Sequence, residues 1–328
     1  MNGEFHYYWT YILATQAGFN RTDAEILAIA TQYPDENIDP VRVITTNGVY
    51  ESTTTHHYGF WDQNAHISIL VPFHFIPGNP DAASAVRRIT PAGRWTVTPH
   101  SPIAKQMLIM ALQTRNLYRI GIALHAYADT WAHQNFSGLN DISNQHPSGS
   151  VLPPIGHAQY GLKPDILHET WQDPRLENNC SHISNRQRFL DAAEMVYRYL
   201  CAYQHRDWAD WFLVKDKIET LIGSPGQEKT PEERLLDYQI EYEAPPAARH
   251  SWKTEALDLP QSSAGVFTHN SVQEKLRWFR DEMLERSSLR ERTTVKARSG
   301  FYESHWYNWM EAAREHRQAV QTLIETHS

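Results

Sequence analysis

The segment "GIALHAYADTWAHQNFSG", residues 121–138, places His125, Asp129 and His133 four residues apart in a stretch of helical character. An α-helix turns by about 100° per residue, so the three side chains share one face at spacings of about 6 Å. Imidazole nitrogens and carboxylate oxygens on one face can converge on a metal ion such as zinc, iron or manganese. The alternative is a polar helix face that carries a His–Asp hydrogen bond.

The residues around this stripe favour the metal site. They are largely apolar or aromatic: Ile120, Ile122, Ala123, Leu124, Tyr127, Ala128, Trp131 and Ala132. Such a helix is buried, and a buried charge needs a partner or a metal ion. We therefore predict that the stripe binds metal.

Composition narrows the class of protein. The chain has 328 residues, 41% of them hydrophobic, and a net charge of −8, which argues against a protein that binds the nucleic-acid backbone. Its two cysteines, Cys180 and Cys201, form no CxxC motif, so metal ligands must come from the 18 histidines and the carboxylates. The N-terminus lacks a signal-peptide pattern, and no run approaches the ~20 apolar residues of a membrane span. We expect a cytoplasmic protein without a transmembrane segment.

The pattern of apolar residues and breakers predicts a mainly α, or all-α, protein. We expect helices at 4–17, from residue 22 to Pro34, and at 102–135, 185–222, 271–291 and 302–326. Residues 38–100 hold β-branched pieces among Pro, Gly and Asn, and they predict a loop-rich insertion with short strands or turns. We expect a metal-binding core at 1–222 and a helical C-terminal part at 223–328, packed into one compact domain.

Further candidate ligands lie outside the stripe: His6, Asp35, His57, His157 and Asp165. Each has an ordinary structural reading, such as a hydrogen-bonded core histidine or an aspartate that ends a helix. Their order along the chain is more informative than any one of them. Whether His56, His74, His168 or His316 joins the site is left open.

This order resembles the zinc-dependent phospholipases C and the single-strand-specific zinc nucleases. In that superfamily a helix carries His-x-x-x-Asp with a further histidine shortly after it, and "ALHAYADTWAHQ" is similar to its "ALHYLGDxxxPxH" helix. The whole chain, from "FHYYWTYILA" to "WMEAAREHR", resembles more closely a family described only as a domain of unknown function.

The resemblance implies a helical fold with a cluster of two or three zinc ions. Its implied metal ligands are His6, Asp35, His57, His125, Asp129, His133, His157 and Asp165. Asp129 would bridge two ions, and Asp35 would bind a metal or act as general base. The phospholipases also use a mature N-terminal amine as a ligand, and Met1 and Asn2 do not match their N-termini. Gly161 stands where they have a glutamate, so Asp165 or His168 could replace it, or one metal site could be lost.

We therefore expect a metal-dependent hydrolase that cleaves a small-molecule or lipid-like phosphoester with a metal-activated water. A helical HD-type phosphohydrolase is a poorer match, because the His-Asp dipeptide that it requires is absent. Two alternatives stay open. One is an iron- or manganese-dependent enzyme of specialised metabolism on the same scaffold, such as an oxygenase, lyase or cyclase. The other is a non-enzymatic helical protein with a structural metal.

Overall fold

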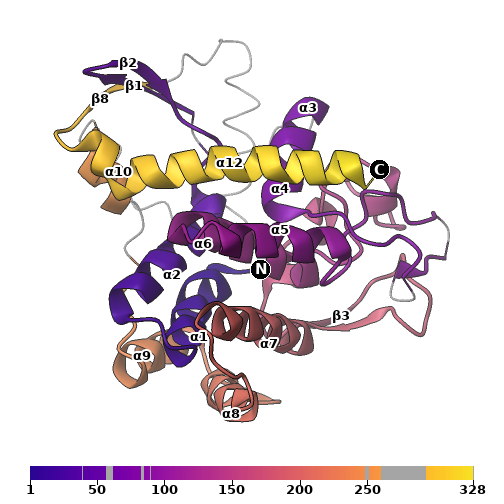
Figure 1. The fold of residues 1–328 in the computed structure, drawn as a ribbon. Coiled ribbons are helices and arrows are strands. Elements are labelled where there is room, and N and C mark those ends of the chain that lie inside the picture. The colour runs from indigo at the N-terminus through magenta and orange to yellow at the C-terminus, as the bar shows by residue number, and fades with distance from the viewer. Residues whose placement is uncertain are drawn as a thin grey trace.

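The protein is mainly helical, as predicted, and also contains a small mixed β-sheet (Figure 1). The computed structural model describes residues 1–38, 40–56, 62–82, 85–88, 90–247, 251–259 and 293–327. Its α-helices are α1 (Thr10–Gln16), α2 (Arg21–Glu36), α3 (Gln63–Ala65), α4 (Val71–His74), α5 (Pro102–Gln113), α6 (Leu117–Ala132), α7 (Asn185–Tyr203), α8 (Trp211–Ile222), α9 (Pro231–Glu241), α10 (Ser251–Ala256) and α12 (His305–Thr326). The helix predicted at 271–291 lies outside the described residues.

Short π- and 3₁₀-helical segments connect these helices. The π-helical segments are η1 (Glu4–Trp9) and η2 (His66–Leu70), and the 3₁₀ turns are η4 (Ile142–Asn144), η5 (Ala158–Tyr160), η6 (Lys163–Asp165) and η8 (Phe301–Glu303). The strands are β1 (Val41–Thr45), β2 (Gly48–Glu51), β3 (Thr170–Gln172), β4 (His182–Ser184), β5 (Gly223–Ser224), β6 (Gln227–Glu228), β7 (Leu257–Asp258) and β8 (Thr293–Ala297). Four of them form the mixed sheet in the order β2-β1-β8-β7, with β1 parallel to β8.

Helix α6 is the centre of the fold. The Asn116 side chain accepts hydrogen bonds from the first backbone amides of the helix, and every residue from Arg119 to Ala132 is buried. Helices α2, α4, α5, α7 and α12 all pack against it. Gly121 allows the closest approach, because a β-carbon there would lie 2.5 Å from the β-carbon of Ala30 on α2. The helix with the His/Asp stripe is therefore fixed from several sides.

Helix α2 continues past Pro34, where we expected it to end. Proline cannot donate to the carbonyl of Ala30, which would be its partner in a regular helix. The indole Nε1 of Trp309 donates to that oxygen instead, at 3.1 Å. Because the helix continues, Asp35 lies close to His125, with Asp35 Oδ1 3.6 Å from His125 Nε2.

The insertion at 38–100 is more helical than its β-branched sequence predicts. It contains the β1–β2 hairpin, but the piece "HISILVPF" forms η2 and most of α4 instead of a strand. The reason is tertiary, because α4 packs between α6 and α12 and buries Val71 and Phe73. This helical run ends at His74.

Two C-terminal helices pack against segments that lead to the stripe. Helix α12 runs alongside α6 in Figure 1 and buries Trp306, Trp309 and Met310. From α9, Arg234 donates to both carboxylate oxygens of Glu4, and the Tyr238 hydroxyl also bonds Glu4. The N-terminal segment is thus fastened to α9.

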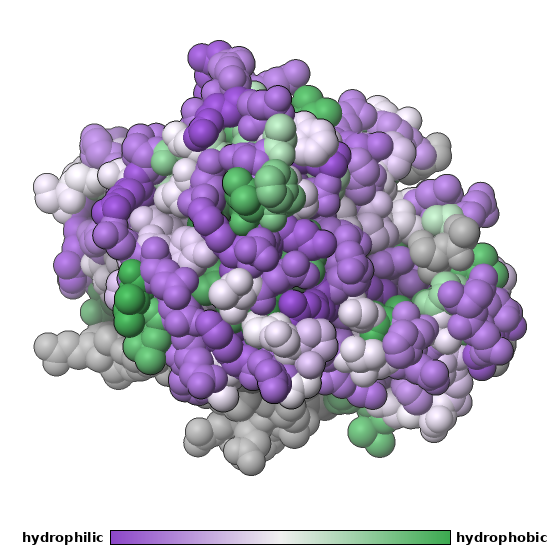
Figure 2. Space-filling view, turned by 90° about the horizontal axis from the view of Figure 1, so that it is seen from below, coloured by the Kyte–Doolittle hydropathy of each residue, from purple (hydrophilic) through white to green (hydrophobic). Residues whose placement is uncertain are grey.

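The surface seen from the side of α8 and α9 is mostly hydrophilic and carries small, separate apolar areas (Figure 2). Exposed apolar side chains on these two helices include Phe212, Leu213, Leu236 and Ile240. Within the described part of the chain, no helix is both long and apolar enough to cross a membrane.

Candidate metal centre

Histidine and aspartate side chains from six segments converge at one end of α6. Helix α6 supplies His125 and Asp129, and its C-terminal cap is His133. The other members come from η1, α2, α4, the residue before η5, and η6: His6, Asp35, His74, His157 and Asp165. Nitrogen and oxygen atoms of these residues form three overlapping groups whose members lie within 4.8 Å of one another.

The first group surrounds one point with two histidines and two aspartates. His74 Nδ1 and His125 Nε2 are 3.0 Å apart, and each lies 3.3 Å from Asp129 Oδ2. Asp35 Oδ1 lies 3.7 Å from the first nitrogen and 3.6 Å from the second. Two ligands about 2.0–2.1 Å from a tetrahedral zinc ion are roughly 3.3 Å apart. The separations among Asp35, His74 and His125 therefore suit three ligands of one ion, and Asp129 Oδ2 lies at ligand spacing from both histidines.

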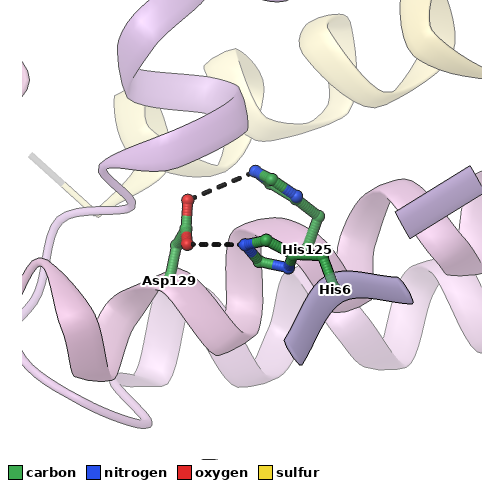
Figure 3. Close-up of side chains that lie close together, drawn as sticks. All are labelled: His6, His125 and Asp129. Atoms are coloured by element: carbon green, nitrogen blue, oxygen red, sulfur yellow. Dashed lines mark hydrogen bonds and ion pairs between the residues drawn. The ribbon is translucent and has the colours of Figure 1, made fainter. Parts of the chain in front are cut away.

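The second group uses the other oxygen of Asp129 (Figure 3). His6 Nε2 lies 3.2 Å from Asp129 Oδ1, and its ring stacks on that of His125 with centroids 3.9 Å apart. The amino group of Met1 also contacts Asp129 Oδ1 and lies 3.6 Å from Asp165 Oδ1. A positive charge thus occupies the space between these two carboxylates. Although Met1 does not match the phospholipase N-terminus in sequence, its amine reaches the cluster.

The third group is formed by His133, His157 and Asp165. His133 Nε2 lies 3.8 Å from Asp165 Oδ1, and His157 Nε2 lies 3.4 Å from Asp165 Oδ2. Asp165 Oδ1 is buried and has no hydrogen-bond partner among the described residues. The Met1 ammonium, 3.6 Å away, compensates part of its charge, and a bound metal ion would satisfy this oxygen directly.

Hydrogen bonds on the far side of four imidazoles fix which nitrogen faces the cluster. His125 Nδ1 lies 2.7 Å from the carbonyl of Thr31, and His74 Nε2 lies 3.0 Å from that of Thr55. His133 and His157 make the same kind of bond, from Nδ1 to the carbonyls of His74 and Gly161, each at 2.8 Å. Because carbonyls only accept, these nitrogens carry the proton, and the opposite nitrogen of each neutral ring presents a lone pair to carboxylate oxygens. Lone pairs facing carboxylates need a proton or a metal ion between them, and metal-bound histidines are held by outer bonds of this kind.

The charges of the cluster depend strongly on one another. Burial alone raises the pKa of Asp129, but the Met1 ammonium, His133 and His125 hold it well below its usual value. Burial lowers the pKa of His125, and the carboxylates of Asp129 and Asp35 outweigh it and raise that pKa.

His6 differs from His125 in this respect. Burial, together with the neighbouring charges of His125 and the Met1 ammonium, lowers the pKa of His6 to about 4. His6 is therefore neutral near pH 7, which is the form that binds metal.

The structure brings together most of the residues predicted from the sequence: His6, Asp35, His125, Asp129, His133, His157 and Asp165. His57 lies outside the described residues. Of the two replacements for the missing glutamate, Asp165 is in the cluster, whereas His168 is exposed. The buried His316 lies outside the three groups and bonds the carbonyl of Pro72.

His74 joins the cluster although we did not select it from the sequence. Its only signal was a polar residue in the apolar run "VPFHFIPG", and that signal does not indicate contact with α6.

The model of a family of unknown function, DUF6765, matches residues 1–324, and the chain belongs to this family. Neither curated proteins nor solved structures gave a match. The resemblance to zinc phospholipases C therefore has no support from these comparisons and remains a hypothesis based on the helix motif.

Proposed function

We propose that this member of DUF6765 is a metal-dependent hydrolase that cleaves a phosphoester bond, with two or three zinc ions held by the cluster. The observation that carries the proposal is the arrangement of His74, His125, His133 and His157. Each bonds a backbone carbonyl through one nitrogen and directs the other at a carboxylate. In the metal-free protein, protons must lie between these nitrogens and the carboxylates, and bound metal ions would take the place of those protons.

The residues present suit zinc. Asp35, His74 and His125 would hold one ion together with Asp129 Oδ2, and His133, His157 and Asp165 would hold a second. His6 and Asp129 Oδ1, which the Met1 amine also contacts, would face a third. Bound zinc ions supply a nucleophilic water near neutral pH and neutralise charge on a phosphoryl group.

The side chains of the cluster would divide the remaining work. Asp129, 1% exposed, would join two sites through its two oxygens and keep them at a fixed separation. Among the three aspartates of the cluster, Asp35 has the most exposed side chain, at 30%, so a water molecule can reach it. We assign Asp35 to orient that water and accept its proton, in addition to its contact with the first group.

The donor set also suits iron or manganese, since it contains imidazole and carboxylate and no thiolate. An iron- or manganese-dependent enzyme of specialised metabolism is therefore the second candidate. A structural metal would instead be enclosed by its ligands and would leave no position for a substrate.

The test is a comparison of chelated and metal-reloaded protein on a phosphodiester and a phosphomonoester of p-nitrophenol. We expect hydrolysis to vanish on chelation and to return with zinc, and to be lost in His125→Ala. His168→Ala is the matched control, because His168 is an exposed histidine outside the three groups. Zinc-loaded protein that is inactive on both esters would contradict the proposed reaction. Bound iron or manganese would favour the second candidate.

A further inference from the structure

Three arginines are packed around a single aspartate beside a cavity at some distance from the metal centre. Asp173 is 1% exposed, and Arg175 binds both of its oxygens, with Nε at 2.9 Å and Nη2 at 2.6 Å. Arg87 and Arg188 lie close enough for Asp173 to act on their charges. Neither makes an ion pair within 4.0 Å in the part of the chain that the structure describes.

Arg87 and Arg175 point toward the same oxygen. Arg87 Nη1 and Arg175 Nη1 both donate to the carbonyl of Ser143, at 2.7 Å and 3.2 Å. Two guanidinium groups with like charge are therefore held side by side. Burial, followed by the charge of Arg175, lowers the pKa of Arg87 to about 10, so Arg87 still carries its charge near pH 7.

The positive charge of this cluster exceeds its negative charge. Among the described residues, these three arginines make one ion pair within 4.0 Å, the one between Arg175 and Asp173. Arg87 Nε and Arg188 Nη1 are buried and have no hydrogen-bond partner among the described residues. Buried cations in excess are unfavourable unless an anion compensates them.

A cavity of about 210 Å³ opens beside the two paired guanidiniums. At roughly 30 Å³ per water molecule it has room for an anion of several heavy atoms. Its lining combines the hydrogen-bonding side chains of Arg87, Thr90, Gln145, His146 and Arg175 with the apolar Ile142 and Pro147.

We propose that this cavity binds a tetrahedral oxyanion, either inorganic phosphate or the phosphate of a small phosphomonoester. Arginine suits this group because its donors carry charge, and Nη1 and Nη2 of Arg87 each keep a second hydrogen beside the one donated to a carbonyl. The cavity lining shares no residue with the three groups of the metal centre. The ring of Phe136 contacts both sites, with the guanidinium carbon of Arg175 at 3.9 Å and the ring of His157 at 5.9 Å.

The proposal is tested by thermal unfolding of the full chain after chelation, so that no metal can bind the anion. Phosphate and glycerol 3-phosphate are titrated separately against chloride at matched ionic strength. We expect a saturable rise in the unfolding midpoint, as for a ligand that binds only the folded state. A larger effect of phosphate would identify the free ion as the ligand, and a larger effect of the ester would identify a phosphomonoester.

Two variants address the site itself. Arg87→Met removes one guanidinium, and we expect affinity for the oxyanion at least about tenfold weaker. Thr90→Tyr adds a phenol ring to the lining of the cavity and keeps both arginines. This variant tests the site if Arg87→Met does not fold. Arg42→Met is the control, since Arg42 is an exposed arginine on β1. The proposal is wrong if neither anion gives a saturable shift in the wild-type chain, or if Thr90→Tyr responds like the control.

Discussion

The substitution Asp129→Asn should lower both the stability of the metal-free protein and the amount of metal that the protein binds. In the metal-free protein this carboxylate is 1% exposed and faces the Met1 ammonium, His6, His74 and His125. Removal of one partner from a buried ion pair costs about 3–5 kcal/mol, because the other charge stays buried. We expect the free energy of unfolding to fall by about that amount at pH 7, measured by denaturant titration in the presence of chelator.

The same variant should lose more than one metal ion. The two oxygens of Asp129 face different histidines, with Oδ1 near His6 and Oδ2 near His74 and His125, and a neutral amide is a poor replacement for a bridging carboxylate. Asp191→Asn is the control, since Asp191 is exposed on α7 and its carboxylate accepts a hydrogen bond from Gln187 on the same helix. If Asp129→Asn unfolds at the same denaturant concentration as this control and keeps its metal, the reasoning about the cluster is refuted.

Three further predictions concern the supports of the site. Gly121→Ala should destabilise the protein by about 1–3 kcal/mol and lower its metal affinity, because the new methyl group forces α6 away from α2; Gly93→Ala, in open space, should do neither in the same unfolding and metal-titration assays. His316→Leu should weaken metal binding at the group that contains His74, because the hydrogen bond from His316 Nε2 to the carbonyl of Pro72 holds α4 in place. Unchanged metal affinity, measured by chelator competition, would show that α4 does not need this bond. The metal-free protein should lose stability as the pH falls from about 6.5 toward 4, because the pKa of His6 is about 4 in the fold and near 6.5 when unfolded, so protons bind preferentially to the unfolded chain. His6→Gln should reduce this loss, and an unchanged pH profile of unfolding would rule out His6 as its source.

The sequence predicted those parts of the site that follow from local periodicity. His125 and Asp129 are four residues apart on one helix, and this spacing alone places both side chains on one face. The central helix was recognisable for the same reason, since its apolar residues surround the stripe.

His74 could not be predicted in this way. It is 51 residues from His125 in the chain, at the end of a β-branched run that forms a helix because it packs between α6 and α12. The carbonyls that fix the histidine tautomers, such as those of Thr31 and Thr55, belong to the backbone and leave no mark in the sequence. The continuation of α2 past Pro34 likewise depends on Trp309, which comes from the opposite end of the chain.

The most direct test of the metal centre is elemental analysis of the untagged protein purified without added metal. The account predicts two or three equivalents of zinc per chain in the wild type, with fewer in both His74→Ala and His125→Ala, and no change in His168→Ala. A wild-type protein that contains no bound zinc, iron or manganese, and takes up none on titration, would contradict it and leave these residues as a buried hydrogen-bond network.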